Sequence, residues 1–238
     1  MPASQIPSRK TISAMFDAIS PTYDRANRIL SLGLDLYWRR VLSRQLPRKE
    51  ISHVLDIATG TGDQVISILK EFPEDNFKMT GIDMSPDMLQ LARKKMTTIP
   101  NHERVEFLLC DAGRLPFEDE AIDCITISFG VRNFINLHHC LNEMFRVLTQ
   151  KGKMLILEFA MPPNPIIRNI HLQYLRHIVP LLGKTISRHP TAYRYLNQTI
   201  EVFPYGKSFG SLLQHIGFKD VQIISLTFGI VNIYVAQK

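Results

Sequence analysis

Several features that mark particular classes of protein are scarce or missing in this chain of 238 residues. No apolar run approaches the length of a membrane span, so we expect no transmembrane helix. Residues 1–10 lack the apolar segment of a secretory signal. The three cysteines, Cys110, Cys124 and Cys140, show neither C-x-x-C nor metal-ligand spacing, and the 8 histidines are scattered. The sequence therefore predicts a cytoplasmic protein without disulfides or a metal site, with its cysteines in the core.

Charged residues are present in ordinary number but are unevenly distributed. Lys and Arg outnumber Asp and Glu by 9 to 4 in residues 1–50 and by 5 to 0 in residues 161–200, whereas residues 51–160 carry 11 basic and 16 acidic residues. The basic segments thus lie outside the middle of the chain. This distribution favours an anionic partner, either a membrane surface or a nucleic acid, over those segments; simple solvated charge is the alternative.

The middle of the chain alternates between short apolar strands and helices. Strands are predicted at 53–58, 78–82, 105–110, 121–128 and 154–159, helices at 64–72, 86–97 and 134–148, and a turn at 150–153. A helix at 208–216 and two strands at 218–228 and 230–237 follow. This order predicts an α/β fold with a mostly parallel sheet closed by an antiparallel hairpin. We divide the chain into an arm (1–50), a core (51–160), an insertion (161–200) and a segment that completes the core (201–238).

A glycine-containing turn joins the first predicted strand to the first helix. Its sequence is Asp56-Ile57-Ala58-Thr59-Gly60-Thr61-Gly62-Asp63. Glycines at such a turn let the backbone approach a ligand at the carboxyl end of the strand. Asp83 ends the next strand, 21 residues after Gly62, where a carboxylate can accept hydrogen bonds from both hydroxyls of a ribose. The dinucleotide pattern G-x-G-x-x-G is incomplete because Val65 occupies its sixth position, so this turn alone indicates either a site for another kind of nucleotide or an ordinary tight turn.

Acidic residues at three successive strands narrow the choice of nucleotide. Asp56 lies in the first strand, Asp83 ends the second, and Asp111-Ala112 follows the third. This order resembles the class I S-adenosylmethionine-dependent methyltransferases, which have a Rossmann-like fold. The resemblance implies S-adenosylmethionine as the methyl donor and assigns its contacts: Gly60, Thr61, Gly62 and Asp63 at the methionine half, Asp83 at the ribose, Asp111 and Ala112 at the adenine, and Ser128 as the floor beside the sulfonium.

Further motifs over residues 12–238 resemble one family, the ubiquinone and menaquinone biosynthesis C-methyltransferases, which includes the demethylmenaquinone methyltransferases. The most specific are Phe129-Gly130-Val131-Arg132-Asn133 and Leu157-Glu158-Phe159. The chain departs from the family pattern at Thr59, where glycine is usual, at Gln198, where a carboxylate is usual, and at Tyr234, where histidine is usual. Of these departures, the one at Thr59 reduces the backbone freedom of the glycine turn.

The resemblance also implies a reaction and an acceptor. A methyl group would pass to a ring carbon of a reduced polyprenyl quinone, either demethylmenaquinol or a methoxy-polyprenyl-benzoquinol. We assign Arg132 to stabilising the phenolate that develops, Asn133 to orienting it and Tyr23 to a hydrogen bond with it. Alternatively, Arg132 is a residue at a helix start that pairs with a nearby carboxylate. An RNA methyltransferase and a non-catalytic S-adenosylmethionine-binding module are the alternative functions.

The arm and the insertion have apolar patterns of their own. Residues 12–19 show helical spacing and form either one wall of the acceptor pocket or a cover for the sheet edge. In the insertion, an apolar stripe predicts a helix that acts as a lid or contacts a membrane, or one that only packs as a cap. The stripe is Ile167, Ile170, Tyr174, Ile178 and Leu181. The expected partners are therefore a lipid-soluble quinol and, peripherally, the inner face of a membrane, without nucleic acid; a homodimer is left open.

Overall fold

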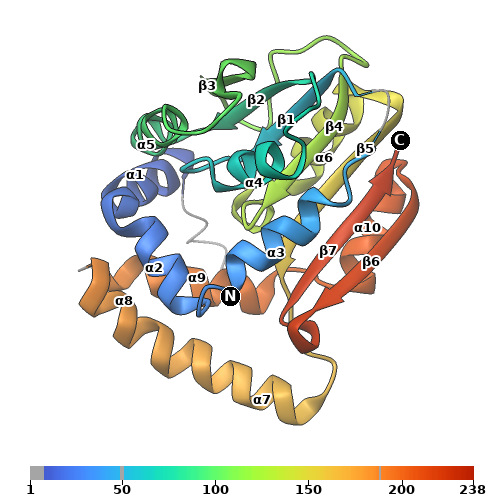
Figure 1. Ribbon diagram of the computed structural model, residues 1–238. Coiled ribbons are helices and arrows are strands. Elements are labelled where there is room, and N and C mark those ends of the chain that lie inside the picture. The colour runs from blue at the N-terminus through green and yellow to red at the C-terminus, as the bar shows by residue number, and fades with distance from the viewer. Residues whose placement is uncertain (1–7, 49–50, 188) are drawn as a thin grey trace.

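The computed structural model describes residues 8–48, 51–187 and 189–238 and is built on one seven-stranded sheet (Figure 1). The strand order is β3-β2-β1-β4-β5-β7-β6. The strands are β1 (His53–Ile57), β2 (Lys78–Asp83), β3 (Val105–Leu109), β4 (Ile122–Ser128), β5 (Leu148–Phe159), β6 (Lys219–Leu226) and β7 (Val231–Gln237). Strands β1 to β5 pair in parallel, and β7 pairs antiparallel with both β5 and β6. The predicted parallel sheet with a closing hairpin is confirmed.

Helices cover both faces of the sheet, as the alternation of side chains along each strand requires. Val54 packs in a cluster that contains Trp38, whereas its neighbour Leu55 packs in a second cluster that contains Met144. The helices on the first face are α3 (Leu34–Ser43), α4 (Asp63–Glu71) and α5 (Pro86–Met96), and those on the second face are α6 (Leu137–Val147) and α10 (Lys207–Ile216). The core is therefore a three-layer structure.

Local capping residues determine where two of these helices begin. The Ser85 side chain accepts a hydrogen bond from the Met88 amide at 3.1 Å, and Pro86 occupies the first helical position of α5, as predicted. Helix α6 begins later than the predicted residue 134, because Asn136 caps it by accepting from the His139 amide at 3.1 Å. Residues Val131–Asn133 instead form a separate 3₁₀ turn, η3, directly after β4.

Two other predictions for the core are wrong in detail. The turn expected at 150–153 lies within β5, which begins at Leu148 and has an irregular register against β4 before Lys153. A distorted strand therefore replaces the turn. Cys124 and Cys140 are buried as predicted, but Cys110 is only partly buried because it follows β3, the strand at the edge of the sheet.

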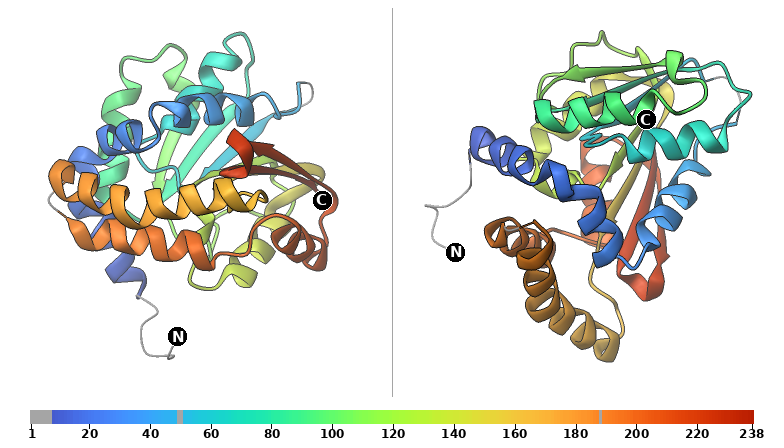
Figure 2. Two further views of the ribbon diagram at one scale, coloured as in Figure 1. Left: turned by 90° about the horizontal axis from the view of Figure 1, so that it is seen from below. Right: turned by 60° about the vertical axis from the view of Figure 1, so that its left-hand side comes forward.

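The arm and the insertion pack against each other near the carboxyl ends of the parallel strands (Figures 1 and 2). Their helical elements are α1 (Arg9–Ile19), η1 (Ser20–Thr22), α2 (Tyr23–Leu30), α7 (Pro165–Gln173), the π-helical turn η4 (Tyr174–Ile178), α8 (Val179–Ser187) and α9 (Pro190–Val202). They share a third apolar cluster, in which Ile19 and Ala26 of the arm meet Leu175 and Val179 of the insertion. Helix α9 was not predicted; it lies beside α8.

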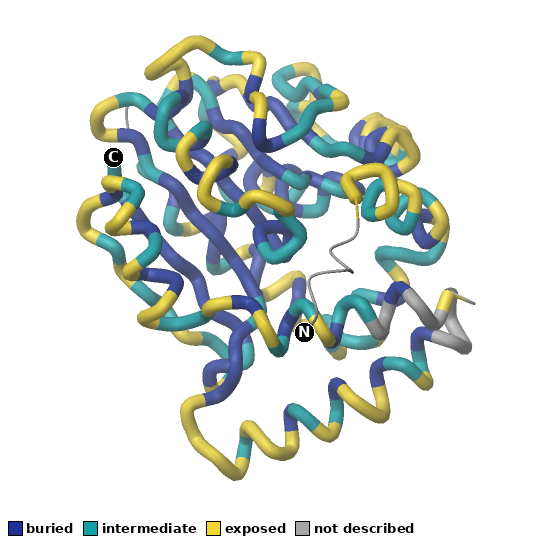
Figure 3. Tube along the Cα trace, turned by 180° about the vertical axis from the view of Figure 1, so that it is seen from behind, coloured by how far each residue is buried: buried dark blue, intermediate teal, exposed yellow. Residues whose placement is uncertain are grey.

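The predicted apolar stripe of the insertion is not its buried face. Ile170 and Leu181 are 64% and 63% exposed, whereas His171, Leu175 and Val179 are buried. Figure 3 shows this as exposed residues along the outer side of the long α7–α8 helix. The face is selected by packing against the arm, and the wider turn η4 alters the helical spacing on which the prediction relied.

Candidate active site

The glycine turn after β1 adopts a conformation that needs its glycines. Gly60 and Gly62 have φ angles of 56° and 81°, in the left-handed region that favours glycine. A side chain at position 60 would meet only the Tyr23 ring, at 4.0 Å, so it would fill the space between them. Thr59, which departs from the family pattern, has an ordinary φ and its hydroxyl donates to Asp56 at 2.6 Å. The turn therefore forms without a glycine at position 59 and leaves room for a ligand beside Gly60.

Asp56 lies beneath this turn as a buried carboxyl group. Its two oxygens accept hydrogen bonds from the hydroxyls of Thr59 and Thr126, each at 2.6 Å. Burial raises the pKa of Asp56 to about 6, although these two hydrogen bonds act in the opposite direction. Asp56 therefore supports the turn and the end of β4 from below.

The strand-end cavity, as we name it, lies where β1, β2 and β4 end and the arm covers them. It is lined by Gly60, Asp83, Asp111, Ala112 and Ser128 among the predicted cofactor residues, and by Tyr23 and Asn133 among the predicted catalytic ones. Residues of α1 close its other side, including Arg9, Ile12 and Phe16. The structure thus brings together residues from strands that are far apart in the sequence, together with the arm.

Most polar groups of the strand-end cavity already have partners. Asp83 accepts from the amides of Gly60 and Ser85, both at 2.9 Å, and burial raises its pKa. Asp111 forms an ion pair with Arg9 of α1 at 2.7 Å. The Ser128 hydroxyl donates to the Gln64 side chain at 2.9 Å. The cavity therefore presents ordered polar groups among mainly apolar walls, an arrangement complementary to a ligand with hydroxyl and amine groups on a ring system.

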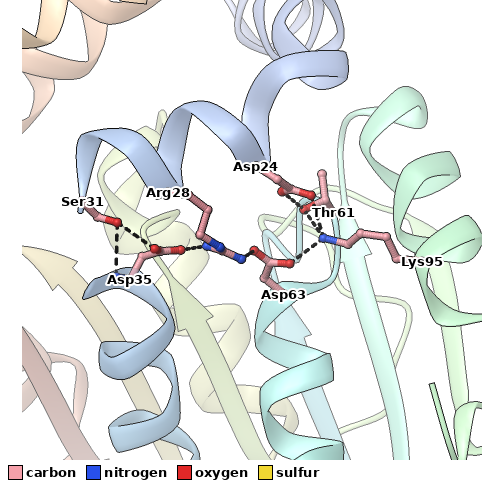
Figure 4. Close-up of polar contacts among 7 residues, drawn as sticks. All are labelled: Asp24, Arg28, Ser31, Asp35, Thr61, Asp63 and Lys95. Atoms are coloured by element: carbon pink, nitrogen blue, oxygen red, sulfur yellow. Dashed lines mark hydrogen bonds and ion pairs between the residues drawn. The ribbon is translucent and has the colours of Figure 1, made fainter. Parts of the chain in front are cut away.

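Thr61, Gly62 and Asp63, the other predicted cofactor residues, do not line this cavity. Thr61 and Asp63 belong to a charged network that ties the arm to the glycine turn (Figure 4). Thr61 donates to Asp24 of α2 at 2.5 Å, and Asp63 is bound by Lys95 at 2.5 Å and by Arg28 at 2.6 Å. Arg28 also pairs with Asp35 of α3. These contacts hold α2, and with it Tyr23, against the turn.

The lid cavity, as we name the second space, lies between the arm, the end of β4 and the insertion, and encloses about 340 Å³. Its walls are mainly apolar and include Leu30, Leu34, Phe159, Ile167 and Leu196. Apart from Asp35 Oδ2, which is ion-paired with Arg28, four buried polar atoms on its lining residues have no hydrogen-bond partner: Arg39 Nε, Arg132 Nε, Asn133 Oδ1 and His171 Nε2. Unpaired buried polar atoms are costly, so their gathering at one apolar cavity indicates a ligand with polar groups on an apolar body.

Arg132 forms the carboxylate pair that the sequence analysis gave as one alternative, while its role toward a phenolate stays a prediction. Its guanidinium forms a buried ion pair with Glu158 at 2.6 Å, and the two side chains are 6% and 0% exposed. The same nitrogen donates to the Phe129 carbonyl at 2.6 Å, and the guanidinium lies 5.5 Å from the centre of the Phe159 ring. Arg132 is thus paired with a carboxylate and also lines the lid cavity.

The two cavities meet at a shared wall formed by Phe16, Tyr23, Phe129 and Asn133. Tyr23 is enclosed there, and burial raises the pKa of its hydroxyl although the nearby charges of Arg39 and Arg132 oppose this. The predicted catalytic residues Tyr23 and Asn133 therefore face both cavities, and Arg132 faces one of them. A group bound in one cavity can approach a group bound in the other only beside this wall.

The sequence reasoning did not single out Arg39, Glu158 or His171 as site residues. Glu158 had a local signal, because it is an acid within an otherwise apolar strand. Arg39 and His171 had none, since each lies in a helix with other polar residues and becomes a cavity residue only through packing.

Comparisons with known proteins identify the family of this chain and its fold. Residues 4–238 match the family model described as the ubiE/COQ5 methyltransferase family. A ubiquinone/menaquinone biosynthesis C-methyltransferase UbiE of Citrifermentans bemidjiense is 38% identical over 95% of this chain and 96% of its own length. A demethylmenaquinone methyltransferase of Chlorobaculum tepidum is 39% identical over 98% of this chain and 95% of its own length.

Solved structures support the fold alone, because their identity to this chain is low. A possible histamine N-methyltransferase of Thermotoga maritima, described as S-adenosylmethionine-dependent, superposes with a TM-score of 0.66 at 16% identity, covering 94% of this chain and 99% of that one. The fold is therefore that of S-adenosylmethionine-dependent methyltransferases. From the family match and the full-length relatives together, this chain belongs to the ubiE/COQ5 methyltransferase family.

Proposed function

We propose that the protein transfers a methyl group from S-adenosylmethionine to a ring carbon of a reduced polyprenyl quinone. The observation that carries this proposal is the pair of cavities: one at the strand ends that is bordered by carboxylates and a hydroxyl, and a larger, more apolar one under the lid, meeting at Tyr23, Phe129 and Asn133. A water-soluble nucleoside suits the first cavity, and a ring with hydroxyl groups and an isoprenoid tail suits the second.

In this proposal the strand-end cavity binds the methyl donor. The Gly60 backbone leaves space for it, and the Asp83 carboxylate lies where a ribose would present its hydroxyls. Asp111 and Ala112 border the adenine, Ser128 lies under the sulfur, and Thr61, Gly62 and Asp63 hold the turn in place. When bound, S-adenosylmethionine supplies an electrophilic methyl group.

The quinol ring would lie in the lid cavity against the shared wall. A ring carbon becomes a good nucleophile only when a neighbouring hydroxyl loses or shares its proton. Arg132 is fixed by Glu158 and Phe129, and we assign its positive charge to stabilising that oxygen as it loses its proton. Asn133 and Tyr23 border the same wall and orient the ring, so little reorganisation accompanies the reaction.

The lid cavity also suits a substrate that arrives from a membrane. Leu32 and Ile170 line the cavity yet are 86% and 64% exposed, and Phe228, next to the lining residue Thr227, is 77% exposed. We propose that these three residues, the rim, contact the bilayer at its cytoplasmic face, with the acid-free insertion favouring anionic lipid. No helix among the described residues is both long and apolar enough to cross a membrane.

The direct test is incubation with methyl-labelled S-adenosylmethionine and a panel of reduced naphthoquinones and benzoquinones. We expect label on a ring carbon of at least one quinol, identified by mass spectrometry. Structured RNA and the oxidised quinones serve as controls and should remain unlabelled. Cofactor binding without labelling of any quinol would contradict the proposal and favour a non-catalytic module, whereas labelled RNA would favour the alternative enzyme.

A further inference from the structure

Arg39 of α3 is a buried cation whose charge is not matched by a bonded carboxylate. Its residue exposure is 7%, and its Nε has no hydrogen-bond partner. Within the described part of the chain, its guanidinium forms no ion pair, and its recorded contact is with the Phe129 ring, at 5.4 Å from the ring centre. A cation in such surroundings is unfavourable unless an anion accompanies it.

The neighbouring cations differ from Arg39 in this respect. Figure 4 shows Arg28 bound to Asp35 and Asp63, and Lys95 bound to Asp24 and Asp63. The carboxylates of this network, Asp24, Asp35 and Asp63, are therefore already paired with cations other than Arg39. Burial acts to raise the pKa of Asp63, but the charges of Arg39, Lys95 and Arg28 outweigh it and lower that pKa, so Arg39 lies near the start of α4 without bonding to it.

The position of Arg39 favours one kind of anion. Gln64, in the first turn of α4, donates to the Arg39 carbonyl at 3.4 Å and accepts from the Ser128 hydroxyl at 2.9 Å, so α3 is tied to the glycine turn and to the end of β4. Phe129, under the Arg39 guanidinium, belongs to the wall that both cavities share. Arg39 itself lines the lid cavity beside this wall, so an anionic group that extends from the strand-end cavity along Phe129 would come next to its guanidinium.

We propose that Arg39 binds the α-carboxylate of S-adenosylmethionine and so fixes the methionine half of the methyl donor. This inference rests on the proposed function, in which the donor lies beside Gly60. The carboxylate is a permanent anion, whereas the quinol becomes anionic only during the reaction and already has Arg132 beside it. Arg39 therefore acts as a binding residue that positions the sulfur, and Arg132 acts on the acceptor.

The test compares two ligands that differ by this carboxylate alone. S-adenosylmethionine and decarboxylated S-adenosylmethionine are titrated into the wild-type protein and into Arg39→Met by calorimetry. Arg39→Met should weaken S-adenosylmethionine binding by about 10- to 100-fold, as expected for one or two charge-assisted hydrogen bonds, and leave the decarboxylated ligand unchanged. Arg40→Met is the matched control, because that neighbouring side chain is 63% exposed and pairs with Glu71; it should change neither affinity.

Thermal unfolding gives a second readout that does not depend on turnover. Because the Arg39 charge also stabilises ionised Asp63, each protein is compared with its own free form: Arg39→Met should reduce the rise in Tm that S-adenosylmethionine causes, whatever the Tm of the free variant. Equal weakening of both ligands, or no weakening, overturns the inference. If Arg39→Met fails to fold, Arg39 is a structural residue. The variant Arg39→Gln is then titrated instead, and the inference is overturned if this variant still prefers S-adenosylmethionine to the decarboxylated ligand as strongly as the wild type does. A wild-type protein that binds neither ligand would instead refute the proposed function.

Discussion

The two cavities meet at one wall but are built in different ways. In the strand-end cavity, Asp83 and Ser128 have hydrogen-bond partners within the protein, and Asp111 is paired with Arg9. In the lid cavity, unpartnered atoms of Arg132 and His171 face mainly apolar walls. Internal partners give the first cavity a shape that is independent of a ligand. Residues that line the second carry buried polar atoms without a hydrogen-bond partner in the described part of the chain, and its cation Arg132 suits an acceptor whose charge changes during the reaction.

The largest effect is expected where the lid cavity contains its buried ion pair. Arg132→Leu would leave the Glu158 carboxylate, which is 0% exposed, without its cation. Losing one partner of a buried pair costs about 3–5 kcal/mol, so this variant should lose that much free energy of unfolding in urea. The double variant Arg132→Leu/Glu158→Gln removes both charges and should regain most of the loss. If the single variant is as stable as the wild type, the pair is not a structural feature of the lid cavity.

The same double variant separates folding from catalysis. It should bind S-adenosylmethionine with normal affinity, because the strand-end cavity is untouched, but lose about 100- to 1000-fold in methyl transfer to a quinol, the typical value of a charge placed at a developing anion. Single-turnover kinetics with saturating cofactor measures this. If the double variant turns over near the wild-type rate, Arg132 has a structural role alone, and the lid cavity no longer differs from the strand-end cavity in acting on the acceptor.

Asp56, which is buried beneath the turn that borders the strand-end cavity, lowers the free energy of unfolding when it is ionised. Burial raises the pKa of Asp56 to about 6, above its value in the unfolded chain, so the folded state holds a proton that the unfolded state releases near pH 4. Its contribution to stability is therefore present below pH 4 and is lost as pH rises to about 6. Asp56→Asn should remove this dependence and be more stable than the wild type by about 2–3 kcal/mol at neutral pH, by the same linkage. Parallel stability curves for the two proteins from pH 4 to pH 7 would contradict this.

Asp83 tests whether the strand-end cavity acts on the cofactor alone. Asp83→Ala should weaken S-adenosylmethionine binding by about 10- to 100-fold, because the hydrogen bonds lost are to a charged group, and leave turnover at saturating cofactor within a few fold. Asp83→Asn is the control, since its amide oxygen can still accept from the Gly60 or Ser85 amide. Unchanged affinity in calorimetry would remove Asp83 from the site, and a raised KM for the quinol would show that the two cavities are not separable.

The smallest effect is expected at the rim of the lid cavity. Leu32→Ser/Phe228→Ser should reduce sedimentation with anionic vesicles and raise the KM for a long-tailed quinol by about 3- to 10-fold, because roughly 1 kcal/mol is lost when part of an apolar side chain leaves lipid. A quinol without a tail should be used normally. Val202→Ser is the matched control, as Val202 is 70% exposed but does not line the cavity. If the rim variant and the Val202→Ser variant sediment equally with anionic vesicles, the rim does not contact the membrane.

The fold and the strand-end cavity were largely predictable because their signals are local. Apolar spacing indicated the strands, Ser85-Pro86 marked the start of α5, and Gly60 and Gly62 indicated a turn with positive φ, all of which the structure contains. Parallel strands bring their carboxyl ends to one edge of the sheet, so residues such as Asp83 and Ser128 meet there whatever the details of packing.

The sequence by itself therefore determined the parallel sheet, the glycine turn and the polar residues at the strand ends. Only the tertiary structure decided that Arg132 pairs with Glu158, that Arg39 lies over Phe129 without a carboxylate, and that the insertion buries His171 instead of Ile170. Backbone preferences act between residues a few positions apart, whereas these contacts depend on how whole helices pack. The face of a helix that is buried depends on how much apolar surface it covers together with side chains that are distant in the sequence. A local sequence pattern does not include those distant side chains.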